Sequence, residues 1–327
     1  MPALHNCDRT VAWSEDRELR TKTADLIMAL YLGIDSGGSK TRCALGDENR
    51  VLGTSMSAGS NVIRQGSAGA KEALQAAVRE VCTVANTTPH KIARIAIGAA
   101  GAARPAVAAT IKSILAELTP AAVEVVGDMV IALEAAFAGG PGVIAIAGTG
   151  SIAYGRNSAG DTARAGGWGF AVSDEGSGHW IGRSAVSAIF RARDEGRETA
   201  LTNAILQAWS LKSFDDLIQA ANLQALPEFP RLVPVVLRAA NEGDELARSL
   251  FVEAGTRLAD LAAIVIRRLA QTPYAPIAMA GSVFRQSADV RQVFYNCLEK
   301  GFPGIEVRPE LAEPVQGALA LARRAGA

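Results

Sequence analysis

The sequence predicts an α/β protein made of two similar units. Two β-hairpins, near residues 30–46 and 143–155, each carry a tip of glycines and small hydroxyl residues. Alternating apolar strands and helical segments follow each hairpin, and a Gly-rich break at 139–142 separates the two units. This repetition indicates an internal duplication in which each unit places a three-stranded meander beside parallel strands with covering helices.

The first unit has the order ββ(β)αβαβα. The segment 68–85 is Ala-rich with apolar residues at helical spacing, such as Leu74 and Val78, and Pro120 stops a second helix. Strands are predicted at 30–35, 40–46, 50–56, 92–97 and 123–126, and helices at 68–85, 106–118 and 129–137.

The second unit repeats this order with a longer helical insertion. Strands are predicted at 143–147, 152–155, near 164–165, at 276–280 and at 305–307. Helices are predicted at 177–193, at several places within 199–271, at 290–298 and at 315–323. The two hairpin tips are then expected to face each other across a cleft between the units, where ligand sites commonly lie.

Composition excludes several classes of partner. Lysine plus arginine equals aspartate plus glutamate at 33 each, so neither nucleic acid nor an anionic membrane is indicated as a partner. The four cysteines are isolated, lack metal-ligand spacing and fit a reducing, cytoplasmic compartment. Residues 1–27 are polar, mixed in charge and without a signal-peptide core, so we expect a disordered extension there.

The first hairpin tip, residues 35–41, has the composition of a phosphate-binding turn. Gly37 and Gly38 let backbone N–H groups approach phosphate oxygens, Ser39 and Thr41 can donate hydroxyls, and Asp35 can hold a hydrated Mg²⁺. It is not a Walker A loop, because a serine separates glycine from lysine and a strand follows. Taken alone, these residues would equally form an ordinary Gly-rich turn.

The second tip, residues 148–151, offers the same chemistry from the other unit. Two opposed tips favour a clamp around a nucleotide tail over two unrelated turns. Asp128 follows a strand directly and precedes a helix, so it lies at the strand's carboxyl end, which faces the ligand crevice in open α/β sheets. There a carboxylate can accept the proton of an attacking hydroxyl during γ-phosphate transfer, or it can cap the helix.

Two further segments are candidates for ligand contact. Gly281 and Ser282 follow a strand and allow a flat ligand to lie against the backbone, although a plain strand–helix turn has the same sequence. The run 166–178 holds several glycines with Trp168, Asp174 and an adjacent glutamate. Asp174 can accept sugar hydroxyls or cap the following helix, and Trp168 can lie in the core.

These motifs together resemble the N-acetylglucosamine kinase branch of the actin/sugar-kinase/Hsp70 ATPase superfamily, which is also grouped with the BadF-BadG-BcrA-BcrD-type ATPases. The similarity covers about residues 30–325. Its motifs are Leu32-Gly-Ile-Asp-Ser-Gly-Gly-Ser-Lys-Thr41, Ala58-Gly-Ser-Asn61, Ile146-Ala-Gly-Thr-Gly-Ser151, Gly166-Gly-Trp-Gly-Phe170 with its continuation to Ile181, and Ala278-Met-Ala-Gly-Ser-Val283.

The resemblance implies a two-domain actin-like ATPase (ribonuclease H-like) fold with duplicated βββαβαβα units. One domain would comprise 28–139 plus 313–327 and the other 140–312. The segments 97–101 and 314–321 would connect the domains, which close around substrate.

The resemblance also implies an ATP- and Mg²⁺-dependent kinase acting on the 6-hydroxyl of an amino sugar, with Asp128 as the catalytic base and Asp35 binding Mg²⁺ through water. ATP contacts are expected from Gly37, Gly38, Ser39, Lys40, Thr41, Gly150, Ser151, Gly281 and Ser282. Substrate contacts are expected from Asn61, Asp128, Gly148, Thr149, Gly167, Trp168 and Asp174. Relatives are often homodimers, so a homodimer is expected.

Other functions stay open at this point. N-acetylglucosamine is the favoured substrate, with glucosamine or N-acetylmuramic acid as alternatives. An ATPase that activates a redox partner is a second class of protein, but the paired cysteines that hold an iron–sulfur cluster in such relatives are missing, as is the Cys/His zinc cluster of the repressor/kinase family. A sugar-binding protein with an inactive kinase site is a third.

Overall fold

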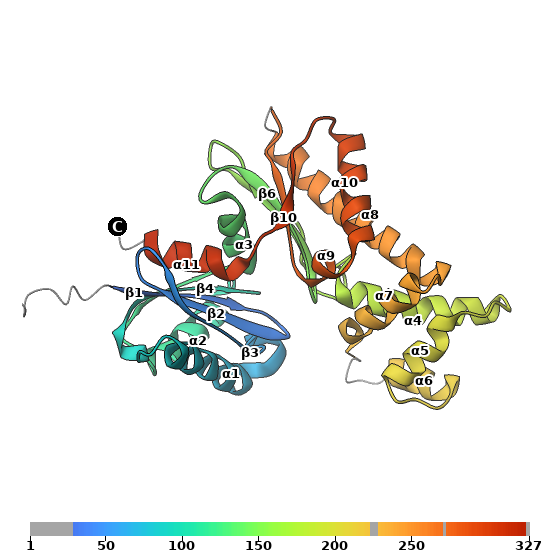
Figure 1. Ribbon diagram of the computed structural model, residues 1–327, viewed down its shortest axis with the longest axis horizontal. Helices are drawn as coiled ribbons and strands as arrows, with labels where there is room; N and C mark the ends of the chain where they lie inside the picture. Colours follow the sequence, from blue (N-terminus) through green and yellow to red (C-terminus); the bar gives the residue numbers. More distant parts are fainter. Residues whose placement is uncertain (1–28, 223–227, 271–272, 325–327) are drawn as a thin grey trace, which may run out of the picture.

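The computed structural model describes residues 29–222, 228–270 and 273–324 (Figure 1). The extension predicted at 1–27 lies outside the described residues, as do parts of the helical segment predicted at 199–271.

Two five-stranded sheets form the framework, and both have the same topology. The first has the order β3-β2-β1-β4-β5 and the second β10-β9-β6-β7-β8. The strands of the first are β1 (Leu30–Ser36), β2 (Lys40–Gly46), β3 (Val51–Ala58), β4 (Ile92–Ala99) and β5 (Ala122–Val126). Those of the second are β6 (Gly142–Ala147), β7 (Ser151–Arg156), β8 (Thr162–Gly166), β9 (Ile277–Ala280) and β10 (Val307–Leu311).

In each sheet an antiparallel meander continues into parallel strands. β1 pairs antiparallel with β2 and parallel with β4, and β6 pairs antiparallel with β7 and parallel with β9. The predicted duplication is therefore confirmed at the level of strand order and direction.

Helices cover both faces of each sheet because strand residues alternate between the faces. On the first sheet, α1 (Val62–Val84) and α2 (Pro105–Ala116) cover one face, and α11 (Pro314–Arg324) covers the other. On the second sheet, α8 (Glu245–Leu269) and α10 (Ala288–Gly301) cover one face, and α3 (Asp128–Phe137) covers the other.

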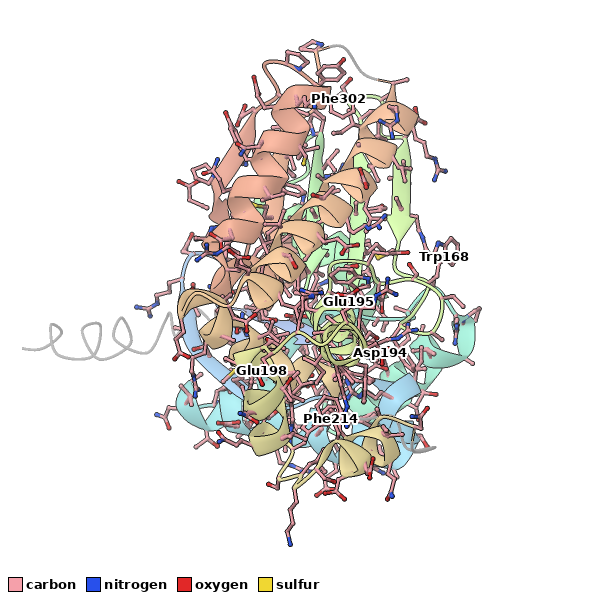
Figure 2. The ribbon with its side chains drawn as sticks, turned by 90° about the vertical axis from the view of Figure 1, so that its right-hand side faces the viewer. Trp168, Asp194, Glu195, Glu198, Phe214 and Phe302 are labelled. Carbon is pink, nitrogen blue, oxygen red and sulfur yellow. The ribbon has the colours of Figure 1, made fainter. Side chains whose placement is uncertain are left out.

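A group of helices is inserted between β8 and α8 and lies beside the second sheet (Figure 1). Phe214 packs there against Phe190, with the Arg193 guanidinium 4.3 Å from its ring centre (Figure 2). The elements of this group are α4 (Gly178–Asp194), α5 (Ala200–Ala208), α6 (Phe214–Ala221), the 3₁₀ turn Phe229–Leu232 and α7 (Val233–Asn241). Two further short elements are the 3₁₀ turn Pro89–Lys91 and α9 (Ser282–Gln286).

The helices α3 and α11 pack against each other between the two sheets (Figure 1). Their backbones approach so closely that a Cβ on Gly317 would overlap the Ile131 carbonyl oxygen. Glu134 of α3 is buried and accepts hydrogen bonds from Arg156 of β7 and Arg324 of α11. One carboxylate thus ties three elements at the junction of the two halves.

Three details differ from the sequence-based expectation. The helix predicted at 68–85 begins at Val62, because an additional turn precedes a break at Gly66, whose φ is +71°. The last strand is Val307–Leu311 rather than 305–307, since an edge strand tolerates the proline and charged residues that it contains. The predicted connector 97–101 instead includes the end of β4, paired with β1 inside the first sheet.

The chain crosses between the halves through α3 and through the entry into α11. α3 contacts both sheets: Leu133 and Phe137 join the apolar cluster of the second sheet, while Ile131 lies so close to Gly98 of β4 that a Cβ there would overlap it. The division into 28–139 plus 313–327 and 140–312 therefore stays a proposal, with α3 as a shared element. No helix among the described residues combines the length and apolarity that spanning a membrane requires.

Candidate active site

The first hairpin tip connects β1 to β2 through Gly37, Gly38 and Ser39. The Gly37 N–H donates to the Lys40 carbonyl oxygen at 3.0 Å, and a Cβ on Gly37 would lie 2.8 Å from that oxygen. Glycine is therefore required for the tight turn. Gly59, in the loop after β3, packs beneath Gly38 with no room for a side chain.

Buried hydroxyl groups hold this tip from below. Ser36 and Ser60 are joined by a 2.8 Å hydrogen bond between their Oγ atoms, and the Thr41 hydroxyl lies 2.8 Å from the Ala58 carbonyl oxygen and 2.7 Å from the Ser60 Oγ. The Thr41 side chain is fully buried. Its hydroxyl therefore supports the turn rather than lying at the surface that would meet ATP.

Asp35 lies at the end of β1, opposite Arg42 in the hairpin register. Burial and, next, the negative charge of Asp128 raise the pKa of Asp35 to about 6, while Arg42 and Lys40 lower it. The negative charge of Asp128 makes ionisation of Asp35 unfavourable unless a cation is near. This environment therefore suits a divalent cation that prefers oxygen ligands, such as Mg²⁺.

The donor set near Asp35 fits magnesium held jointly with a substrate. Within the part of the chain that the structure describes, no group of three or more His, Cys, Asp or Glu side chains is arranged to hold a metal by itself. Mg²⁺ commonly keeps several waters and is held by one or two carboxylates together with phosphate oxygens. Asp35, next to the first hairpin tip, is such a carboxylate.

Asp128 is the first residue of α3, directly after β5 and Gly127. Its Oδ1 accepts a hydrogen bond from the Met129 N–H at 3.0 Å, and burial raises its pKa. The N-cap position belongs to Gly127, so the alternative of Asp128 as the N-cap is wrong. The carboxylate lies at the helix N-terminus, where negative charge is favourable.

The second hairpin tip, between β6 and β7, is fixed by the start of α4. The Gly178 N–H donates to the Gly148 carbonyl oxygen at 2.8 Å, and the His179 N–H donates to that of Thr149 at 3.2 Å. The Ser151 hydroxyl donates to the Glu175 carbonyl oxygen at 2.7 Å. Like Thr41, Ser151 is buried and uses its hydroxyl inside the protein.

Asp174 lies against the second tip. A Cβ on Gly150 would lie 2.8 Å from the Asp174 Oδ2, and the N–H groups of Ser151 and Gly169 donate to the carboxylate. Burial raises its pKa, and the charge of Asp128 adds to that effect. Its φ of +70° is uncommon outside glycine, and such backbone conformations cluster at functional sites.

The helix that follows Asp174 begins at Gly178 and is capped by Ser177, whose hydroxyl accepts from the Trp180 N–H at 3.1 Å. The interpretation of Asp174 as that cap is therefore wrong.

The two tips meet directly. The Ser39 Oγ and the Thr149 Oγ1 lie 3.1 Å apart, which confirms that the hairpins face each other. Asp35 adjoins the first tip, Asp174 packs against Gly150 of the second, and the negative charge of Asp128 raises the pKa of both. Three carboxylates from three separate segments therefore lie near this junction.

Gly281 lies beside the second tip and begins the turn into α9. Its φ is +103°, and a Cβ there would overlap the backbone of Ala147, the last residue of β6. Ser282 is the first residue of α9. The motif therefore places backbone, rather than side chains, next to the second tip.

Asn61 caps α1, since its Oδ1 accepts from the N–H groups of Ile63 at 2.9 Å and Arg64 at 3.2 Å. Its amide NH₂ is the donor left for a ligand.

Trp168 is 71% exposed at the edge of the molecule, with the Arg164 guanidinium 3.9 Å from its ring centre (Figure 2). The interpretation of Trp168 as a core residue is therefore wrong. Gly167, with φ of +69°, turns the chain outward at this point.

Charged residues that sequence reasoning missed connect the two halves. Glu313, just before α11, pairs with Arg42 at 2.7 Å and with Arg285 of α9 at 2.5 Å. Burial, followed by the charges of Arg42 and Arg285, lowers the pKa of Lys40. A signal for Arg42 was present in the hairpin register, which places it opposite Asp35.

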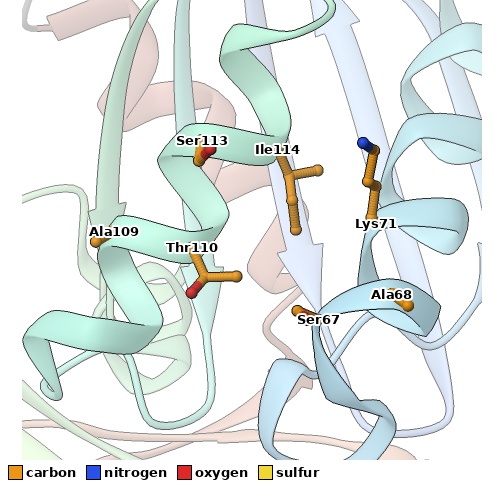
Figure 3. A pocket seen from close by; sticks show the side chains of 7 residues that line it. All are labelled: Ser67, Ala68, Lys71, Ala109, Thr110, Ser113 and Ile114. Carbon is orange, nitrogen blue, oxygen red and sulfur yellow. The ribbon is translucent and has the colours of Figure 1, made fainter.

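A shallow hollow between the first turns of α1 and the middle of α2 includes Lys71, Thr110 and Ser113 (Figure 3). None of the predicted site residues lines it, and the Lys71 ammonium already pairs with Glu117 at 2.7 Å. It is separate from the candidate active site.

Comparison with known proteins identifies the class. The chain belongs to the BadF/BadG/BcrA/BcrD ATPase family, whose model matches residues 32–322. Its two-sheet framework is that of the two-domain, actin-like ATPase sugar kinases.

The individual proteins that this chain resembles include amino-sugar kinases. The chain is 32% identical over 302 residues to an N-acetylmuramic acid/N-acetylglucosamine kinase of Clostridium acetobutylicum, covering 90% of this chain and 99% of that one. It is 29% identical to the N-acetyl-D-glucosamine kinase of Dictyostelium discoideum, covering 90% and 97%. The crystal structure of a Chromobacterium violaceum protein assigned as an N-acetylglucosamine kinase matches this chain with a TM-score of 0.72 and 26% identity, covering 90% of this chain and 99% of that one.

Proposed function

We propose that this protein is an ATP-dependent amino-sugar kinase that phosphorylates the 6-hydroxyl of N-acetylglucosamine. The observation that carries the proposal is the gathering of Asp35, Asp128 and Asp174 where the two hairpin tips meet. Phosphoryl transfer needs a metal-bound polyphosphate, a base and a bound acceptor. In this proposal Asp35 serves the metal, Asp128 is the base and Asp174 binds the acceptor.

Asp128 is the base in this proposal. Its raised pKa makes the carboxylate a better proton acceptor than an ordinary aspartate, and Met129 fixes its orientation by the hydrogen bond to Oδ1. Asp35 holds Mg²⁺ through water; when bound, the ion neutralises charge on the transferred phosphate.

The polyphosphate is bound by the two tips. Gly37, Gly38 and Gly150 bring backbone N–H groups to it, Lys40 brings a positive charge, and Ser39 brings a hydroxyl. Thr41 and Ser151 act by holding the tips in shape, because their hydroxyls already have partners inside the protein. Gly281 and Ser282 contact the adenosine.

The sugar is bound by groups that converge from both halves. Asp174 accepts its hydroxyls, Asn61 donates its amide NH₂, and the backbone at Gly148, Thr149 and Gly167 supplies further contacts, with exposed Trp168 nearby. Glucosamine and N-acetylmuramic acid are the alternative acceptors. We further propose a cytoplasmic homodimer as the working form.

Replacing Asp128 by Asn tests the proposal. Loss of the base lowers kcat by about 100- to 10,000-fold, whereas the amide keeps the shape of the side chain and the sugar Kd changes by about 5-fold or less. ADP release gives kcat and titration calorimetry gives the sugar Kd. Asp289→Asn is the control, since Asp289 also lies in the first turn of a helix but is exposed on α10.

A panel of acceptors in the same ADP-release assay separates the alternatives. Release that requires N-acetylglucosamine, glucosamine or N-acetylmuramic acid supports the kinase. Rapid release without any sugar contradicts it and favours a switch ATPase, and near-normal turnover by Asp128→Asn contradicts the assignment of the base.

A further inference from the structure

Arg64 extends from the first half of the protein toward the second. It lies in the short turn of α1 that precedes the break at Gly66, and its N–H donates to the Asn61 Oδ1 at 3.2 Å. Its Nη2 lies 3.4 Å from the Glu228 Oε1 in the second half. A Cβ on Gly38 would lie 3.6 Å from its Nη1, so the guanidinium also lies beside the first hairpin tip.

This guanidinium belongs to a group rich in positive charge. Glu228 also pairs with Arg231 at 2.5 Å, so one carboxylate faces two guanidinium groups. On α4, burial, followed by the charges of Arg183 and Arg64, lowers the pKa of His179. Three arginines and one glutamate therefore lie in the region of Glu228 and His179, and their net positive charge would attract a negatively charged ligand.

The pairing of Arg64 with Glu228 is easily exchanged. Their side chains are 41% and 51% exposed, and solvent-exposed pairs of this kind contribute little to stability. A guanidinium binds a carboxylate through two parallel hydrogen bonds, which gives both strength and direction. A ligand carboxylate can therefore replace Glu228 without a large structural cost.

Apolar rings lie next to this charge. Phe170 packs on His179 with ring centres 4.9 Å apart, and His179 packs on Phe229 at 5.2 Å. Phe229 directly follows Glu228, and Phe170 is 45% exposed. A cation beside aromatic surface suits an organic acid with a short alkyl part better than it suits inorganic phosphate.

We propose that Arg64 is a specificity-determining residue that binds the carboxylate of an acidic amino sugar, one carrying a carboxyalkyl ether on the ring held by Asn61. N-acetylmuramic acid, the 3-O-lactyl ether of N-acetylglucosamine, is the simplest such compound. The inference rests on the proposed kinase function and extends its acceptors from the neutral sugar to the charged one.

Initial rates of Arg64→Gln with each of these two sugars, and with varied ATP, test the inference. The kcat/KM for N-acetylmuramic acid falls about 10- to 100-fold, because a charge-assisted contact is lost. The fall in kcat/KM for N-acetylglucosamine is smaller, about 3-fold or less. For N-acetylmuramic acid, Arg64→Lys should have a kcat/KM between those of the wild type and Arg64→Gln, because lysine keeps the positive charge but cannot form two parallel hydrogen bonds with a carboxylate.

Two further variants sharpen the test. Glu228→Gln removes the competing carboxylate and raises kcat/KM for N-acetylmuramic acid by about 2- to 5-fold. Arg79→Gln is the matched control, since Arg79 is an exposed arginine on the same helix and its hydrogen-bond partner, Gln75, lies one turn earlier on that helix. Arg79→Gln is expected to leave kcat/KM for both sugars unchanged.

The outcomes are distinguishable. Equal losses with both sugars would show that Arg64 serves domain closure or the sugar ring in general, and a raised KM for ATP with either sugar would show that it binds phosphate. A wild type that uses N-acetylglucosamine but not N-acetylmuramic acid overturns this inference and leaves the proposed kinase standing. A wild type that uses neither sugar overturns the proposed kinase itself.

Discussion

At the scale of single residues, Asp35 shows how burial changes the ionisation of a carboxyl group. Its carboxyl has a pKa of about 6 in the folded protein, against 3.8 for an ordinary aspartate, chiefly because of burial and then Asp128. Folding therefore favours its protonated form. The stability that this provides is complete below about pH 4 and is lost as the pH rises through about 6.

Asp35→Asn is accordingly expected to raise the melting temperature at pH 8 in the absence of Mg²⁺, and to raise it much less at pH 4. Activity is expected to fall in the same variant, because the carboxylate proposed to hold Mg²⁺ through water is removed. Scanning calorimetry at both pH values measures the melting temperatures. Addition of Mg²⁺ with ATP should reduce the difference in melting temperature between Asp35→Asn and the wild type at pH 8.

Asp47→Asn is the control of opposite sign. Hydrogen bonds from the N–H groups of Asn49 and Arg50 lower the pKa of Asp47, so its ionised form stabilises the fold above the ordinary pKa, and this contribution is lost as the pH falls. Asp47→Asn should therefore be less stable than the wild type at pH 8. A lower melting temperature for Asp35→Asn at pH 8 would contradict the inference that burial, and next the charge of Asp128, makes the ionised Asp35 unfavourable.

Some site residues could be found from the sequence, because their signal is local. A strand that ends in Asp35 and two glycines, and a strand that passes through Asp128 into a helix, can each be read from a few adjacent residues. The burial of the Thr41 and Ser151 hydroxyls could not be predicted, since their partners Ser60 and Glu175 lie 19 and 24 residues away.

Other residues carried no local signal. Glu313 contacts Arg42 from a position 271 residues later in the chain, so only the folded protein reveals the pair. Trp168 lies in a Gly-rich loop without periodicity, and neither its exposure nor its contact with Arg164 follows from the sequence around it.

At the scale of elements, strand order and direction were predicted well because each strand has its own apolar pattern and the second unit repeats the first. Element ends were predicted less well. The turn before Gly66 depends on its cap by Asn61, and β10 is an edge strand with weak apolar character. The close crossing of α3 and α11 was not predicted, because it depends on two segments far apart in the chain.

Gly317→Ala tests that crossing. The added Cβ would overlap the Ile131 carbonyl oxygen and push α11 away from α3, so we expect the free energy of unfolding to fall by about 1–3 kcal/mol. Urea denaturation followed by circular dichroism measures it.

Gly301→Ala is the matched control, since that glycine ends α10 and a Cβ there would meet nothing within 4 Å. It should leave stability unchanged or slightly higher, as expected for Gly to Ala in a helix. Equal stability of the two variants would mean that the helices can separate slightly at no cost.

At the scale of the whole molecule, two halves with the same sheet topology are joined through α3 and α11, which pack against each other. The halves also contact each other at the hairpin tips, through Ser39 and Thr149, and through Arg64 and Glu228. If the halves move apart to exchange substrates, the tips must separate while the helices remain in contact.

A disulfide between the tips would prevent that motion. The Oγ atoms of Ser39 and Thr149 lie 3.1 Å apart, and a disulfide needs about 2 Å between sulfurs, so Ser39→Cys with Thr149→Cys should crosslink on oxidation after a small adjustment. Turnover of the oxidised double variant should fall by about 10-fold or more and return on reduction, if opening accompanies each cycle.

The comparison is made within one protein, oxidised against reduced, because either substitution alone also alters the site. Ser39→Cys by itself controls for oxidation of the other cysteines, of which Cys43 and Cys82 are buried. Unchanged turnover of a fully crosslinked sample would show that the tips need not separate.

The hydrogen bonds between the second tip and the start of α4 have a consequence for how substrate range changes in evolution. The carbonyl groups of Gly148 and Thr149 accept hydrogen bonds from the N–H groups of Gly178 and His179, and the Asp174 carboxylate accepts one from Ser151, so the second tip and the loop that holds Asp174 form one connected piece. A substitution there would disturb the proposed contacts with both substrates together. The turn that holds Asn61 and Arg64 is separated from the rest of α1 by Gly66, with free space around that glycine, so the contacts proposed there for the sugar can change while the rest of α1 keeps its packing.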